Sequence, residues 1–297
     1  MPLPVLGAKY RAGFDHSDYR SQERIADKMA RQLFAFISLA LKAGVRDRIL
    51  AAMLIVGGLL LLTTPVVAVL SMRQVVALAT SYSLSIISLT GLLLTLFLAM
   101  TLLARDLEQR SVYTVCSLPI SRSAYLLGKF LGLAILIFVA LAILGCFSAG
   151  GLFVLERFYP GQRPLPWGAF ALGLWFQYWV LLIVGGITVL FTTVATSHFL
   201  PLALSVGLYF ASYSTEAVRY FIQSSGGEQR LGPVVKVFGR LVYWVLPNFS
   251  AFDLKAQVVY GVALDAKALL LTQLYGCGYL GILLVLAMIS FSRREFF

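Results

Sequence analysis

The sequence predicts an all-α integral membrane protein with six transmembrane helices, and three observations support that fold class. Hydrophobic residues make up 60% of the 297 residues, with a mean hydropathy of +0.87, whereas soluble domains contain about 45 to 50% apolar residues. Five charge-free stretches exceed the roughly 18 residues that a helical span needs. Lys and Arg gather in alternate connections between them. We therefore treat residues 1–297 as one transmembrane domain.

The segment 18–44 precedes the first apolar stretch and predicts an amphipathic interfacial helix. Apolar residues recur there at helical spacing, and four basic residues share another face, namely Arg20, Arg24, Lys28 and Arg31. Such a helix suits the surface of an anionic membrane leaflet. Either it only anchors the first span, or it also braces a cytoplasmic partner.

The spans are expected at about 49–70, 78–104, 130–153, 170–195, 199–220 and 268–291. The fourth and fifth share a run of 52 uncharged residues, Pro164 to Thr215, which at about 1.5 Å per residue is too long for one crossing. We place the turn between them at residues 196–198, just before Pro201. Residues 221–267, with several aromatic side chains, are expected to form re-entrant or interfacial helices on the outer side.

The distribution of Lys and Arg predicts the orientation. Fifteen of them lie before the first span, between the second and third spans, or at the C-terminus, whereas the short connections on the other side hold three. Because short cytoplasmic loops are enriched in basic residues, both termini and residues 105–129 are expected in the cytoplasm. The net charge of +11 then reflects membrane topology, with lipid as a partner, and no nucleic-acid partner is expected.

Several functional classes are disfavoured by what the chain lacks. The charge-free stretches offer no intramembrane carboxylate or cation for ion-coupled transport. The only histidines, His16 and His198, lie outside the span centres, so haem ligation is not expected. The three cysteines, Cys116, Cys146 and Cys277, follow no metal-binding or disulfide spacing.

The chain is also not expected to be an enzyme or to bind ATP itself. Its only Gly-Lys pair, Gly128-Lys129, has Ser123 where the first glycine of a P-loop belongs and Phe130 where Ser or Thr belongs. The sequence therefore predicts no cofactor, metal or catalytic residue in this chain. Any energy from nucleotide hydrolysis has to come from another polypeptide.

The second span begins with an unusual number of hydroxyl side chains: Ser81, Ser83, Ser85, Ser88 and Thr90. Hydroxyls within helices usually bond to the carbonyl oxygen one turn earlier. The alternative is that they line a substrate path.

Residues 105–129, between the second and third spans, carry the most elaborate polar pattern of the chain. Acidic Asp106 and Glu108 suit the start of a helix, and Pro119 disfavours helical conformation in the residue before it. Ser121 can cap a second helix that leads into the third span. The pattern predicts a short cytoplasmic helix, a break and a second helix. The alternative is an ordinary solvated loop with basic residues.

Within this pattern, Glu108, Thr114, "SLPISR" at 117–122 and "LLGKFLG" at 126–132 resemble the cytoplasmic loop of ABC-2 type transporter permeases. The likeness is closest to the branch of multi-copper enzyme maturation and nitrous-oxide reductase maturation permeases. The terminal "SRREF" at 292–296 adds to it.

The resemblance implies a permease subunit in the plasma membrane of a bacterium or archaeon. It would work with two cytoplasmic ABC ATPase subunits, which bind ATP and Mg, and with a second permease copy or a paralogue. It implies ATPase coupling through Glu108, Arg110, Thr114, Pro119, Ser121, Arg122 and Lys129, and a dimer interface at Gly57, Gly58, Ala203, Ser205 and Gly207. The alternative function is a non-transporting anchor or scaffold subunit of a larger membrane complex.

Overall fold

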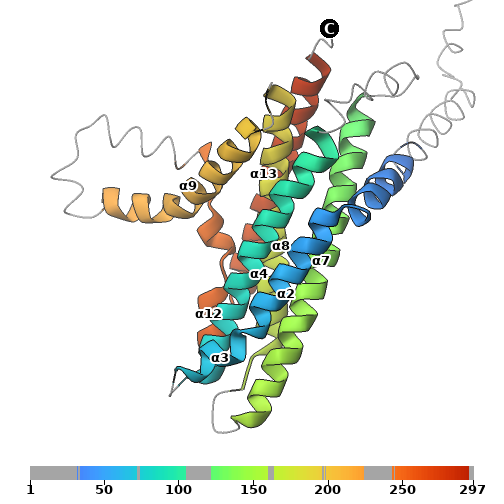
Figure 1. Ribbon diagram of the computed structural model, residues 1–297. Coiled ribbons are helices and arrows are strands. Elements are labelled where there is room, and N and C mark those ends of the chain that lie inside the picture. Colours follow the sequence, from blue (N-terminus) through green and yellow to red (C-terminus); the bar gives the residue numbers. More distant parts are fainter. Residues whose placement is uncertain are drawn as a thin grey trace, which may run out of the picture.

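The fold is a bundle of long helices that run side by side, with the C-terminus at one end (Figure 1). We call that end the terminal end and the other one the opposite end. The computed structural model describes residues 32, 34–71, 74–104, 122–159, 164–195, 197, 199–223, 243 and 245–293. Within these ranges all regular structure is helical.

The first span is broken near its end. The helix Phe34–Val45 leads to α2 (Arg48–Leu62), where the Asp47 carboxylate accepts a hydrogen bond from the backbone N of Ile49 at 3.0 Å. A second short helix, α3 (Thr64–Val69), follows directly. Pro65 has no backbone N–H and cannot continue the hydrogen-bond ladder of α2, so the helix axis restarts there.

The second and third spans are longer than expected. The helix α4 (Val75–Ala99) continues as a π-helix, η1 (Met100–Ala104), and α7 covers Arg122–Phe158. Residues 122–129, which belong to the expected coupling segment, are helical, as expected of the second helix that leads into the third span. These residues include no proline, and their leucines and Tyr125 pack against the bundle, which favours helix from Arg122 onward.

The helix α8 (Trp167–Val194) ends before, and α9 (Phe199–Gln223) begins after, the position expected for the turn. Figure 1 shows α9 leaving the bundle obliquely and projecting sideways. In the described part of the chain five segments are long and apolar enough to cross a membrane, and α9 is not among them: Arg48–Val69, Val75–Leu102, Ser123–Phe158, Trp167–Val194 and Ala266–Arg293. A crossing by α9 therefore stays a prediction.

The described part of the connection to the last helix folds back into the bundle. It contains the 3-10 helix η2 (Phe249–Phe252) and the short helix α12 (Lys255–Tyr260), and α12 ends at Gly261 with φ of 59°. That left-handed conformation suits glycine, which has no Cβ to clash. The last helix, α13 (Ala266–Arg293), returns to the terminal end.

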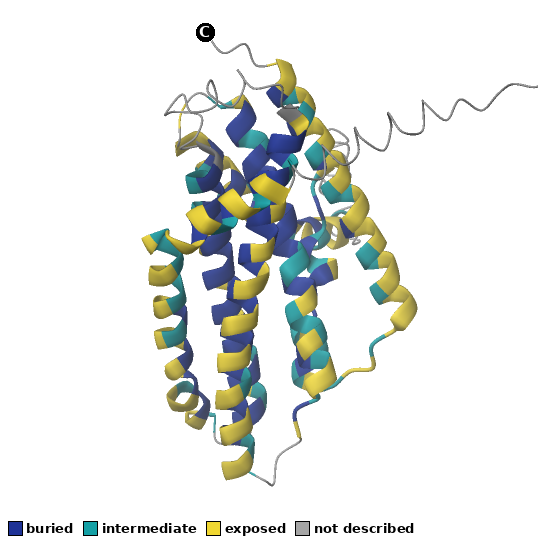
Figure 2. Ribbon diagram, turned by 90° about the vertical axis from the view of Figure 1, so that its right-hand side faces the viewer, coloured by how far each residue is buried: buried dark blue, intermediate teal, exposed yellow. Residues whose placement is uncertain are grey.

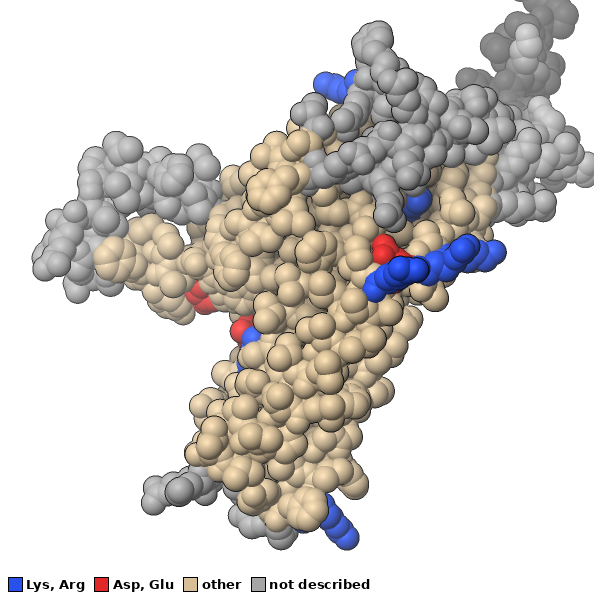
Figure 3. Space-filling model, in the orientation of Figure 1, with Lys and Arg blue, Asp and Glu red and all other residues tan. Residues whose placement is uncertain are grey.

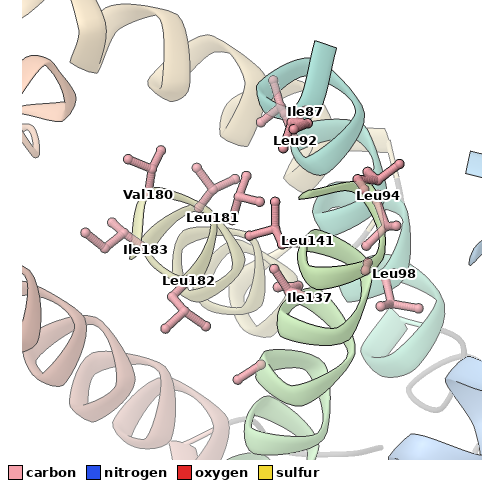
Figure 4. Close-up of a cluster of buried hydrophobic side chains, with 14 of the residues drawn as sticks. Ile87, Leu92, Leu94, Leu98, Ile137, Leu141, Val180, Leu181, Leu182 and Ile183 are labelled. Atoms are coloured by element: carbon pink, nitrogen blue, oxygen red, sulfur yellow. The ribbon is translucent and has the colours of Figure 1, made fainter. Parts of the chain in front are cut away.

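The core lies between α4, α7 and α8. Leucine and isoleucine side chains of the three helices meet there, including Leu98, Leu141 and Leu181 (Figure 4). In the most apolar 18-residue stretch of each helix, 72% of the stretch is buried in α4 and 67% in α8, against 22% in the first span and in α13 (Figure 2). Exposing so much apolar side chain to water would be unfavourable, at about 25 cal/mol per Å². The outward faces of the first span and α13 are therefore suited to lipid or to another apolar protein surface.

Candidate functional site at the terminal end

The expected coupling segment begins and ends at the terminal end of the bundle, where η1 stops and α7 starts. Residues 105–121 lie outside the described part of the chain. Arg122 is the first residue of α7, and its side chain is not among those described. Lys129 is the member of the expected set whose side chain is described. Five other members of the expected set lie outside the described residues: Glu108, Arg110, Thr114, Pro119 and Ser121.

Lys129 is buried, with 3% of its surface exposed, and it links the two ends of the coupling segment. Its Nζ donates a hydrogen bond to the carbonyl oxygen of Leu102 at 3.2 Å and lies 5.8 Å from the ring centre of Tyr125. Leu102 belongs to η1, where the change from α to π geometry alters the backbone pairing. A buried ammonium needs such partners, because its desolvation is costly. Lys129 therefore stabilises the end of α4 against α7.

Tyr125 extends this contact to two further helices. Its ring meets the Phe36 ring edge-on at 5.3 Å and stacks on the Phe291 ring at 6.1 Å. Phe36 belongs to the helix Phe34–Val45, and Phe291 to the last turns of α13. The loop motif identified one member of this cluster, Lys129, from the sequence. The aromatic members were missed, because their spacing is that of ordinary packing residues.

The helix Phe34–Val45 crosses α7 at very short range. A Cβ placed on Gly132 would collide with Ala40, and one placed on Gly44 would collide with Leu136. Ala40 is completely buried. The helix therefore packs on α7, in addition to any contact with the membrane surface. The sequence marks this crossing by two small residues four positions apart, Ala40 and Gly44, because small residues at that spacing permit close helix approach.

The helix α8 also contacts η1. Thr192 donates a hydrogen bond from Oγ1 to the carbonyl oxygen of Thr188 at 2.7 Å, and the same Oγ1 lies 3.9 Å from the Sδ of Met100. Displacement of the segment between η1 and α7 would thus act on α4, α7, α8, α13 and the helix Phe34–Val45 together. Within the described ranges no group of three or more His, Cys, Asp or Glu side chains could hold a metal ion. These contacts among the helices suit the transmission of movement from one helix to another.

The expected dimer residues divide into two groups. Gly57 is buried, and a Cβ there would lie 2.7 Å from Cγ2 of Thr90 and 3.1 Å from Cδ2 of Leu144, so it serves packing within the chain. Ser205 is also buried, with 1% exposed. By contrast, a Cβ on Gly58 or Gly207 would meet no atom within 4 Å, and Ala203 is exposed. Of the five expected residues, these three can present small side chains to another subunit.

The comparison with family models gives one match across nearly the whole chain. The model described as ABC-2 family transporter protein matches residues 16–296. No curated protein matches the chain. The matched range includes every described helix and the segment 105–121.

Proposed function

The chain belongs to the ABC-2 family of transporter permeases, and we propose that it couples ATP hydrolysis by separate ATPase subunits to export or force transmission across the membrane. As a member of that family it is a multi-pass membrane protein and the permease component of an ABC transporter. The coupling itself is our inference. It assigns the ATPase contact to residues 105–129.

The bond between Lys129 and Leu102 carries the argument for that assignment. A segment that receives force from a partner must be joined firmly to the spans at both of its ends. The Lys129 ammonium joins α7 to η1 at 3.2 Å, and Tyr125 adds contacts to Phe36 and Phe291. A loop that only connects two spans would not need a buried cation at its base. This supports a mechanical role over that of an ordinary solvated loop.

We infer the following assembly. Two cytoplasmic ATPase subunits bind ATP and Mg and grip the coupling segment through Glu108, Arg110, Thr114, Pro119, Ser121 and Arg122. A second permease copy or a paralogue completes the membrane part. Both termini face the cytoplasm of a bacterium or archaeon, and the terminal end of the bundle is the cytoplasmic end. ATP is hydrolysed on the partner chains.

Within the family we assign the chain to the branch of multi-copper enzyme and nitrous-oxide reductase maturation. This assignment rests on the motifs "SLPISR" at 117–122 and "LLGKFLG" at 126–132.

Co-expression with each P-loop ATPase found in a neighbouring reading frame tests the proposal. We expect the two proteins to co-purify from membranes, and ATP hydrolysis by the complex in proteoliposomes to differ from that of the ATPase alone. Failure of every neighbouring ATPase to co-purify, together with stable recovery of redox subunits, would favour an anchor or scaffold role instead.

A further inference from the structure

Residues 249–258, which we call the inserted segment, enter the bundle well away from its ends. Phe249 and Val258 are completely buried. The short helix α12 approaches α8 closely, because a Cβ on Gly173 would lie 3.2 Å from Cγ2 of Val258. Residues 253–254 of this segment are not helical. Irregular backbone at membrane depth is tolerated where it is buried in protein or lines a cavity, and here it lines one.

A small pocket lies between the inserted segment and the helices α4 and α8. The space in it that is open to the centre of a water molecule measures about 10 Å³. By this measure a cavity needs roughly 10 to 15 Å³ to hold one water molecule, so the pocket has room for one water-sized molecule. Its polar walls are Ser88 of α4, Gln177 of α8, and Asp253 and Lys255 of the inserted segment, and its other walls are apolar.

The pocket lies near the middle of both spans. Gln177 follows the first residue of α8 by ten positions, and Ser88 follows that of α4 by thirteen. At 1.5 Å per residue these side chains lie about 15 and 20 Å along the helices from the opposite end. A polar group at that depth is costly unless it finds a hydrogen-bond partner.

Two buried side chains of the pocket have unsatisfied hydrogen-bonding atoms. Gln177 is 9% exposed and Ser88 is 6% exposed. Neither the Nε2 of Gln177 nor the Oγ of Ser88 has a hydrogen-bond partner among the described residues. Other hydroxyls of α4 differ, since Ser85 Oγ donates to the carbonyl oxygen of Ser81 at 2.9 Å. Buried polar atoms that lack a protein partner are commonly satisfied by a buried water molecule.

Asp253 adds a third polar group and an entry route. One oxygen of its carboxylate accepts a hydrogen bond from the backbone N of Lys255 at 3.1 Å, and a carboxylate can accept further bonds. Asp253 and Lys255 are both partly exposed, and Figure 3 shows acidic and basic side chains side by side below the projecting α9. Because these two residues line the pocket and also reach the surface, water can enter from that side.

We propose that the pocket binds one water molecule, which joins α4, α8 and the inserted segment. The Nε2 of Gln177 donates to the water oxygen, and the water donates to the Oγ of Ser88 and to the Asp253 carboxylate. Three hydrogen bonds are typical of a buried water. An anion of the same size is disfavoured by Asp253, and a cation by Lys255. The site does not depend on coupling to an ATPase.

A density map of the full chain tests the site directly. The chain is studied in lipid nanodiscs, bound to an antibody fragment, at a resolution that shows ordered water. We expect one peak within hydrogen-bond distance of both Gln177 Nε2 and Ser88 Oγ, and a pocket without density would overturn the proposal. Since a sodium ion gives a similar peak, melting temperatures are compared in equal concentrations of sodium chloride and choline chloride. Equal values support water, whereas stabilisation by sodium would replace the water with a cation.

Two matched serines distinguish a bound water from a hydroxyl that is merely unpaired. Ser148 is 4% exposed, its Oγ also lacks a partner among the described residues, and it does not line this pocket. Ser88→Ala removes an acceptor of the water, so we expect the melting temperature to fall by about 2 to 4 °C. Ser148→Ala removes an unpaired hydroxyl and should leave the melting temperature unchanged or raise it. Equal responses of the two variants would contradict the site.

A double variant tests whether one water serves both buried side chains. Gln177→Met keeps the length of the side chain and removes its donor. If one water bridges Gln177 and Ser88, either single change already weakens its binding, so the double variant should lose less stability than the sum of the two single losses. Additive losses would mean that the two side chains share no bound molecule, and would overturn the proposal.

Discussion

Lys129 and Leu102 lie 27 positions apart in the sequence, yet the Nζ of Lys129 lies 3.2 Å from the carbonyl oxygen of Leu102. This bond joins the end of one span to the start of the next and closes the base of the proposed coupling segment. The buried ammonium of Lys129 therefore lies at the base of the segment through which the permease would receive force from an ATPase.

Replacement of Lys129 by Met tests this bond. The change removes a donor from the Leu102 carbonyl, which costs about 1 to 3 kcal/mol, and removes a buried charge, which offsets part of that cost. We expect a loss of stability of about 1 kcal/mol and a drop of about 2 to 4 °C in melting temperature. ATP-dependent activity should fall much more. Lys129→Arg serves as the control, and full activity in Lys129→Met would contradict the role.

The crossing of the helix Phe34–Val45 over α7 predicts a difference between two glycines of α7. Gly132→Ala brings a methyl group against Ala40, which cannot move away by side-chain rotation, so we expect destabilisation of about 1 to 3 kcal/mol. Gly150→Ala enters open space and should be neutral, or stabilising by up to about 1 kcal/mol. Thermal unfolding of both variants in the same detergent provides the comparison. Equal melting temperatures would mean that the crossing is looser than described.

The outward-facing small residues predict where a second permease copy packs. In a background with Cys116, Cys146 and Cys277 replaced by Ala, we expect Gly58→Cys and Gly207→Cys to form disulfide-linked dimers in membranes. Gly150→Cys is the control, because it is equally open but lies on α7. Crosslinking at Gly150, with none at Gly58 or Gly207, would move the interface to the α7 face.

Orientation is tested by labelling single cysteines with an impermeant reagent in intact cells. The charge distribution predicts that Gln162→Cys and Gln229→Cys react from outside and that Gln109→Cys does not. Labelling of Gln109→Cys in permeabilised cells is the control, because it shows that this cysteine reacts once the reagent can reach it. Labelling at position 109 in intact cells would reverse the assigned orientation.

The sequence predicted the long helices well, because length and apolar composition decide them. Boundaries were less predictable. Pro65 split the first span. The second helix expected after Ser121 begins at Arg122 and is continuous with the third span, because Tyr125 and Leu126 pack against the bundle. The polar residues of 199–220 also gave too weak a signal to show how far α9 departs from the bundle.

The candidate site was only partly visible in the sequence. Lys129 was identified from its place in the loop motif, but its acceptor is a backbone carbonyl, which no sequence pattern marks. The aromatic partners Phe36, Tyr125 and Phe291 were not predicted, because their spacing is that of ordinary packing residues.

The central claim, that an ATPase grips residues 105–129, is tested most directly by reversing charges in that segment. The measurement is the recovery of the ATPase with the purified permease for wild type, Glu108→Arg and Arg122→Glu, with Gln162→Glu as the control in another connection. Breaking a desolvated charge pair costs about 2 to 5 kcal/mol, whereas a solvated charge contributes about 1 kcal/mol or less. We predict strongly reduced ATPase recovery for both reversals, with normal membrane insertion and no change in the control. Undiminished recovery in both reversals would contradict the claim and leave the segment an ordinary loop.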